Sequence, residues 1–166
     1  PFDCAVLLSD GQFPDEWESV LLFEEWLIPV CAASDSEAGP WSLARLRAAE
    51  QLHPTPDRRD WRRWLQATGL GEQVPLKTGQ LFDMLELGIV AAARGYGVSI
   101  GDLLMVAEDV NAGRLGVPWP TAVFSGDSYY MVWPRGHRAQ ARLQRLRDYL
   151  LAEVAALALP GVERLR

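Results

Sequence analysis

The sequence predicts an α/β fold in which short strands alternate with helices and form a largely parallel sheet. Short apolar runs alternate along the chain with segments whose apolar residues recur every three or four positions. The chain has 166 residues, of which 49% are hydrophobic, so it can bury a real core as one medium domain or two small lobes. No internal repeat interrupts this alternation, which favours a layered α/β architecture.

The N-terminal part predicts two strands. Residues 1–8 (P-F-D-C-A-V-L-L) form the first, and Ser9 follows at its end, where open α/β sheets place ligand groups. A plain turn is the alternative interpretation of Ser9. Residues 21–32 predict a long strand in which Pro29 lacks a donor N–H, so we expect this strand to lie at an edge or to change sheets there. A long interrupted strand is typical of a connection between two lobes.

Two short helices should follow. Ser42 is a good N-cap for a helix that ends near Ala49, and residues 51–53 predict a brief strand. Asp57 should cap the second helix, with Asp60 in the position of a capping-box acid. This helix carries four arginines outside its tryptophan face, Arg58, Arg59, Arg62 and Arg63. We interpret them as a solvated surface, and contact with phosphates is the alternative.

Residues 77–101 form the segment around which the rest of the chain is organised. Small and apolar residues spaced as one helical face run from Leu81 to Ala92, and Gly88 would let a sheet approach closely. The loop before this helix contains Thr78, Gly79 and Gln80, where free N–H groups could hold an anion; ordinary capping by Thr78 is the alternative. Residues 98–100 then predict a buried strand.

The C-terminal part predicts a helix over residues 103–112 capped by Asp102, a strand over 128–133, and a long helix over 139–159. The last five residues should fray.

Composition and motifs exclude several classes of function. A net charge of −6 argues against a nucleic-acid-binding surface on this chain, and no apolar run approaches the ~20 residues that span a bilayer. Cys4 and Cys31 are expected to be buried free thiols of a reducing cytoplasm. The sequence contains no nucleophile elbow, phosphate loop, dinucleotide fingerprint or zinc motif, so we predict no catalytic residue, no cofactor and no metal.

Six segments, in order and over residues 2–154, resemble the effector-binding domain of LysR-type transcriptional regulators. The resemblance is strongest to the subgroup of the glycine-cleavage activator and the β-lactamase regulators. The segments are F-D-C-A-V, L-L-F-E-E-W-L-I-P-V-C, His53 with D-R-R-D-W-R-R-W-L-Q-A-T-G, T-G-Q-L-F-D-M-L-E-L-G-I-V-A-A-A-R-G-Y-G-V-S-I, D-V-N-A-G-R-L-G-V-P-W and S-Y-Y-M-V-W-P.

The resemblance implies a two-lobed fold like that of periplasmic binding proteins. Residues 1–27 would be a remnant of the first lobe, 28–133 a complete second lobe, and 134–166 the return to the first lobe. Relative to the family pattern, the chain is expected to be truncated at its N-terminus, so that the first lobe is partial.

The resemblance also implies a site for a small polar or anionic metabolite in the cleft between lobes. Matching the family's motifs assigns the following residues to it: Ser9, Thr78, Gly79, Gln80, Phe82, Ser99, Tyr129 and Tyr130. Because side chains alternate along a strand, only one of the two tyrosines should face the cleft.

The implied function is transcription regulation in the cytoplasm, without an enzyme activity or a membrane partner. DNA would be bound only through a winged helix-turn-helix that is absent from this chain. We expect a homodimer or a higher homo-oligomer. A free-standing solute-binding module and an oligomerisation fragment without a ligand are the alternatives.

Overall fold

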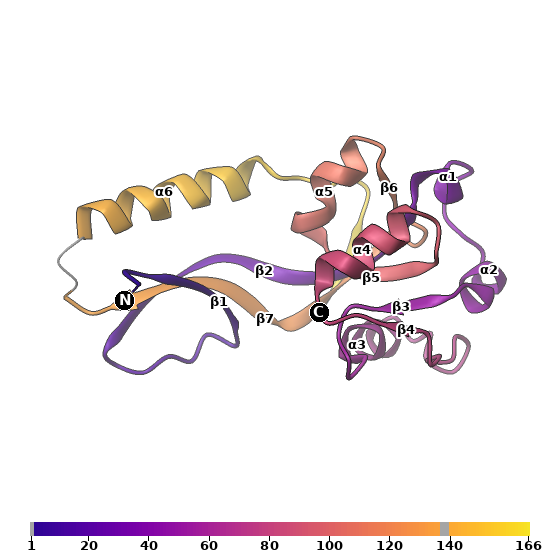
Figure 1. The fold of residues 1–166 in the computed structure, drawn as a ribbon, viewed down its shortest axis with the longest axis horizontal. Helices are drawn as coiled ribbons and strands as arrows, with labels where there is room; N and C mark the ends of the chain where they lie inside the picture. Colours follow the sequence, from indigo (N-terminus) through magenta and orange to yellow (C-terminus); the bar gives the residue numbers. More distant parts are fainter. Residues whose placement is uncertain (1, 137–139) are drawn as a thin grey trace. The chain divides into compact units, whose positions relative to one another are not determined.

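The computed structural model describes residues 2–136 and 140–166, which form two compact units. Unit 1 contains Pro1–Glu25 and Gly126–Ala158, and unit 2 contains Trp26–Ser125 and Leu159–Arg166. Two long strands, β2 (Trp17–Ala32) and β7 (Thr121–Pro134), contribute to both units (Figure 1).

The sheet of unit 2 is mixed, whereas a largely parallel sheet was expected. Strand β3 (Gln51–His53) pairs in parallel with β4 (Gln80–Leu81) and with β5 (Val98–Asp102). Strand β2 is antiparallel to β5 and to β6 (Leu115–Gly116), because it enters this unit against the direction of the strand–helix–strand segments. With β1 (Ala5–Ser9), the strand order of the whole sheet is β1-β7-β2-β5-β3-β4.

Pro29 therefore lies in an interior strand, opposite Ile100, and not at a sheet edge. Strand β6 pairs with β2 at Cys31 and Ala32, just beyond the proline. The neighbours of β2 thus change close to the position at which the sequence predicted a change.

Helices cover both faces of this sheet. One face buries Leu27, Val98 and Ile100 against α2 (Leu43–Ala48) and α3 (Arg59–Ala67). The other buries Ile28 and Leu52 against α4 (Leu85–Ala93) and α5 (Leu103–Asn111). Consecutive residues such as Leu27 and Ile28 enter opposite cores because side chains alternate along a strand. Figure 1 shows α3 and α5 on opposite sides of these strands.

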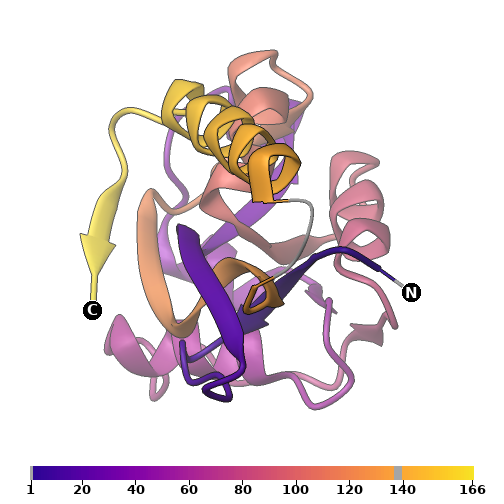
Figure 2. The same ribbon diagram turned by 90° about the vertical axis from the view of Figure 1, so that its left-hand side faces the viewer.

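Unit 1 consists of β1 (Ala5–Ser9), parts of β2 and β7, and α6 (Gln140–Ala156). Strand β1 pairs antiparallel with β7, and α6 covers one side of the strands (Figure 2). Its Leu143 packs on Leu22 and Met131. The predicted start of this helix, Ala139, lies outside the described residues, as does Pro1 of the predicted first strand.

Two helix caps were predicted correctly. The Ser42 side chain accepts a hydrogen bond from the N–H of Arg45, and Asp102 accepts from the N–H groups of Leu104 and Met105. The predicted capping box of α3 was wrong. Its N-cap is Arg58, whose side chain makes no cap, while Asp60 accepts from Thr55. Asp57 nevertheless accepts from the N–H of Arg59, the first residue of the helix, at 3.2 Å.

Two local predictions are corrected at the surface of unit 2. The last residues do not fray completely, because Glu163–Leu165 form β8 and pair in parallel with β7. The polar stretch of residues 34–39, which the sequence predicts as a loop, overlaps the short helix α1 (Ala33–Ser36). Pairing with an existing strand supplies β8 with hydrogen bonds that its own sequence does not reveal.

Candidate functional site

The segment of residues 77–82 is held along β3 in unit 2. The N–H of Lys77 donates to the side-chain oxygen of Gln51 at 2.8 Å, and the N–H of Phe82 donates to the His53 carbonyl oxygen at 2.9 Å. These bonds and the β3–β4 pairing fix the main chain of the segment that the sequence assigned to the effector.

Gly79 permits this close approach. It has φ +49°, which favours glycine, and a Cβ there would overlap the Gln51 carbonyl oxygen and lie 2.8 Å from His53 Nε2. The backbone of residue 79 therefore touches β3 directly, and no other residue type fits without displacing the segment.

The predicted helix N-terminus at Thr78–Gln80 is wrong. Helix α4 begins at Leu85 with Met84 as N-cap, so Thr78 neither caps a helix nor stands at its positive end. Leu81, expected on the buried stripe, is exposed, as is Met84. The reason is tertiary: Gln80 and Leu81 pair with β3, and the chain must leave the sheet before a helix can begin.

Phe82 and Ser99 come together at Gly88 of α4. A Cβ at Gly88 would lie 2.9 Å from Ser99 Oγ and 3.7 Å from the Phe82 ring. Ser99 is fully buried in β5, whereas Thr78 and Gln80 are exposed. The expectation that Gly88 allows close packing on the sheet is confirmed, and Ser99 is reached from solvent only if this packing opens.

His53 is a residue of this region that was not assigned to the site from the sequence. Its Nε2 lies 3.0 Å from the Lys77 carbonyl oxygen and must donate to it, so Nδ1 is the acceptor of a neutral ring. Burial lowers the pKa of His53, and the nearby Arg58 charge acts in the same direction. Within the described residues, the buried Nδ1 has no hydrogen-bond partner.

Among the described residues, Arg58 has a buried donor without a partner, as His53 has a buried acceptor without one. It is the one non-glycine residue with positive φ in the described chain, and its buried Nε has no partner there either. A histidine acceptor and an arginine donor are thus left open in the loop between β3 and α3. The sequence signal was available as a histidine at a strand end, followed by a proline and an arginine that precedes a helix.

The assigned residues of unit 1 lie on β1 and β7. Tyr130 meets Phe13 edge-on at 5.2 Å between ring centroids, while Tyr129 stacks on Phe23 at 4.6 Å. The two tyrosines therefore point in different directions, as strand alternation predicted. Ser9 Oγ accepts from the N–H of Gly11 at 3.2 Å, which is the contact of a plain turn.

The most strongly perturbed carboxylate in unit 2 is Asp102. Burial raises its pKa to about 6, although three backbone N–H groups donate to it and oppose the shift. One of these donors belongs to Trp26 of β2, at 3.1 Å. Asp102 thus joins β2 to the start of α5, which is a structural role.

The cysteines are not a reactive pair. Cys4 and Cys31 are both free, and burial raises the pKa of the Cys31 thiol to about 11. The prediction of free thiols is confirmed, but the predicted burial holds for Cys31 and is wrong for Cys4, which is half-buried.

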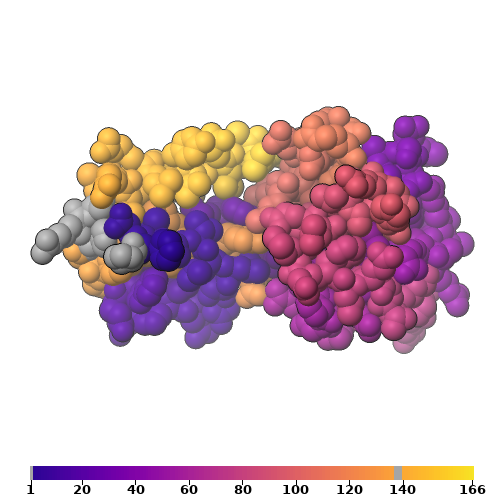
Figure 3. Space-filling model, in the orientation of Figure 1, coloured from indigo at the N-terminus to yellow at the C-terminus, as the bar shows by residue number. Residues whose placement is uncertain are grey.

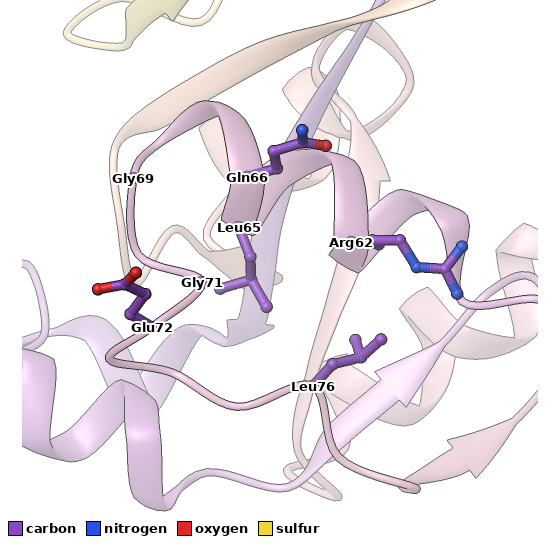
Figure 4. Close-up of a pocket in the computed structure, with 7 residues that line it drawn as sticks. All are labelled: Arg62, Leu65, Gln66, Gly69, Gly71, Glu72 and Leu76. Atoms are coloured by element: carbon purple, nitrogen blue, oxygen red, sulfur yellow. The ribbon is translucent and has the colours of Figure 1, made fainter.

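A surface hollow of about 460 Å³ lies beside α3 (Figure 4). Arg62, Leu65 and Gln66 of the helix line it, together with Glu72 and Leu76 of the following loop. Gly69 and Gly71 form the turn between them. From the sequence, only Arg62 among these residues was considered for ligand contact, as one of four arginines that could meet phosphates.

Across residues 2–136 and 140–166, no group of three or more His, Cys, Asp or Glu side chains is placed to hold a metal ion. No helix in the same part of the chain has the length and apolarity needed to cross a membrane.

Comparison with known proteins identifies a family and several relatives of this chain. Residues 2–155 match the family described as LysR substrate binding domain. The glycine cleavage system transcriptional activator of Escherichia coli K12 is 28% identical over 93% of this chain and 50% of its own length. The HTH-type transcriptional regulator TrpI of Pseudomonas aeruginosa is 27% identical over 92% of this chain and 52% of its own. The chain thus spans about half the length of the curated relatives it matches.

Solved structures agree with the fold. The effector domain of the transcriptional regulator AmpR of Pseudomonas aeruginosa is similar with a TM-score of 0.71 and 25% identity, over 92% of this chain and 72% of that one. The regulatory domain of HypT from Salmonella typhimurium shares the fold, with a TM-score of 0.63 over 93% of this chain and 74% of that one, at 20% identity. The chain therefore belongs to the LysR substrate-binding domain family and is an effector-binding domain of the LysR type.

Proposed function

We propose that this chain senses a small polar or anionic metabolite and thereby controls DNA binding by a winged helix-turn-helix elsewhere in the regulator. The observation that carries the proposal is the family match over residues 2–155. The names of the relatives support it, since both describe transcriptional regulators.

The unit 2 part of the site is proposed at the segment pinned to β3. Thr78 and Gln80 offer exposed polar side chains, Gly79 offers main chain, and Phe82 and Ser99 lie deeper beside α4. The Arg58 Nε–H, a donor without an acceptor in the described chain, suits an anionic group. This arginine replaces the helix N-terminus as the argument for a negative ligand.

The unit 1 part is proposed at Ser9, Tyr129 and Tyr130. A tyrosine ring would cover the apolar part of the metabolite. We propose that the two compact units correspond to the two lobes and that the ligand favours one arrangement of them. The regulator would then be a cytoplasmic homodimer or higher homo-oligomer.

The test uses the intact regulator and its operator DNA. Metabolites that raise the thermal unfolding temperature are carried into a DNA-binding titration, and the variants Thr78→Ala, Tyr129→Phe and Arg58→Gln are compared with wild type. We expect each variant to weaken the metabolite response while ligand-free DNA binding is kept. Glu86→Gln, on the exposed side of α4, is the matched control. An unchanged response in both Thr78→Ala and Tyr129→Phe would show that the assigned site is wrong.

A further inference from the structure

The hollow beside α3 is an open, ligand-sized space distinct from the residues assigned to the effector (Figure 4). Leu65 and Leu76 form its apolar floor. A Cβ on Gly69 would meet no atom within 4 Å, and one on Gly71 would meet only the Leu65 carbonyl oxygen, at 3.8 Å. Its volume of about 460 Å³ falls in the range of small-molecule sites.

The guanidinium of Arg62, beside this floor, has few partners within the described part of the protein. Arg62 donates one N–H to the Asp57 carbonyl oxygen at 3.1 Å, and among the described residues its guanidinium forms no ion pair. Most of its five donors are therefore free, in the planar arrangement that matches a carboxylate. Figure 4 shows Arg62 and Glu72 on opposite sides of the two leucines.

We propose that this hollow binds a small monocarboxylate with an apolar body. The carboxylate would pair with Arg62, and the apolar body would lie on Leu65 and Leu76. Gln66 stands beside the floor and can accept or donate one hydrogen bond to a polar substituent. Glu72 on the far side disfavours a second negative group, which is the reason for a monocarboxylate instead of a dicarboxylate.

The inference goes beyond the proposed effector site, because it names a second site with its own residues. Leu76 is followed directly by Lys77, the start of the segment that is held on β3. A ligand on Leu76 would restrain the approach to that segment, so occupancy of the hollow would be felt at residues 77–82.

The experiment measures binding of phenylacetate to the whole chain by NMR, following the methyl signals of Leu65 and Leu76. Phenylacetamide, an uncharged analogue of the same shape, is the ligand control. We expect millimolar binding of phenylacetate that moves both methyl groups, and affinity for phenylacetamide at least about tenfold weaker. Phenylacetate that leaves both signals unmoved, or that binds no better than phenylacetamide, overturns the proposal.

Variants assign the contacts. Arg62→Gln should weaken phenylacetate about tenfold or more, and Glu72→Gln should strengthen it. Arg47→Gln is the matched control, because Arg47 lines a neighbouring hollow that shares Glu72 with this one. A loss that follows Arg47 and not Arg62 would place the ligand in that neighbour and overturn the assignment.

Gly71→Leu should fill the hollow and abolish binding, since its Cβ has room, while Gly71→Ala should retain it. Far-ultraviolet circular dichroism checks that both variants fold. The surface substitution Arg62→Gln keeps the proposal testable even if Gly71→Leu does not fold. Because residues 77–82 and unit 1 are unchanged in all these variants, failure here is distinguishable from failure of the proposed effector site.

Discussion

His53 Nε2 lies 3.0 Å from the Lys77 carbonyl oxygen, so one buried imidazole holds the start of the segment that contains Thr78, Gly79 and Gln80. Nε2 must carry a hydrogen to donate to this oxygen, while burial penalises the imidazolium form and lowers the pKa of His53. The side chain of His53 in β3 thereby helps to hold the candidate ligand segment in place.

The first prediction concerns pH. The folded pKa of His53 is lowered below its ordinary value of 6.5, so the unfolded chain takes up a proton first as the pH falls. The contribution of His53 to stability is complete above pH 6.5 and is lost as the pH falls through that value toward the folded pKa. Urea unfolding between pH 7.5 and pH 5 should show this loss, and His53→Gln should reduce it.

The chain with and the chain without His53→Gln are compared in a background that also carries His137→Gln. His53 is then the single histidine of the reference chain. The glutamine at position 53 retains an N–H for the Lys77 carbonyl oxygen. An equally steep pH dependence in the two chains would contradict the assignment to His53.

The second prediction concerns Asp102, whose folded pKa of about 6 lies above its ordinary 3.8. Here the folded state holds its proton more tightly, so this group favours folding at low pH and loses that contribution as the pH rises from about 4 to about 6. The direction is opposite to that of His53. The difference between wild type and Asp102→Asn should therefore change over this window and be constant above it.

At neutral pH, Asp102→Asn should lower the free energy of unfolding by about 1–3 kcal/mol. The amide oxygen can replace the atom that accepts from Leu104 and Met105, but the NH₂ group then faces the Trp26 N–H and leaves this donor unpaired. Chemical denaturation measures the loss. No loss at pH 7 would show that the Trp26 contact contributes nothing.

The third prediction separates two costs at Gly79. Gly79→Ala must accept positive φ, which costs about 1–2 kcal/mol, and must also displace the segment from β3, because its Cβ would overlap the Gln51 carbonyl oxygen. Gly113→Ala is the control, since Gly113 has φ +71° and nothing within 4 Å of a Cβ. We expect Gly79→Ala to be the more destabilising substitution in thermal unfolding. Equal losses would mean that the segment moves away without cost.

The fourth prediction concerns self-association through β1. This strand lies at one edge of the sheet. Its Val6 and Leu7 are 51% and 41% exposed. They belong to the indigo segment, which is open to solvent in Figure 3. Unpaired edges with apolar side chains are commonly covered by another chain. Leu7→Lys should therefore weaken the homo-oligomer in sedimentation equilibrium.

Leu87→Lys, on the exposed side of α4, is the comparison for this prediction. Dissociation caused by Leu87→Lys but not by Leu7→Lys would move the interface from β1 to α4. A wild-type chain that remains a monomer at high concentration would contradict self-association altogether.

Local signals in the sequence were sufficient for much of the fold. Ser42 and Asp102 were identified as caps because a short polar side chain before an apolar helix satisfies orphan N–H groups whatever surrounds it. The buried face of α3, with Trp61 and Trp64, followed from helical spacing alone. Six motifs in order were enough to indicate the family, which the match over residues 2–155 confirms.

Only the tertiary structure decided the elements whose hydrogen bonds come from a distant strand. Gln80 and Leu81 carry a helical apolar pattern, yet they pair with β3, and α4 begins later at Leu85. Residues 163–165 form a strand for the same reason, with β7 as partner. His53 and Arg58 could not be predicted as ligand groups from the sequence. Whether a buried atom lacks a partner depends on all its neighbours in space and not on its place in the chain. Elements whose energy is local can be predicted from sequence, and those whose hydrogen bonds and burial come from distant segments cannot.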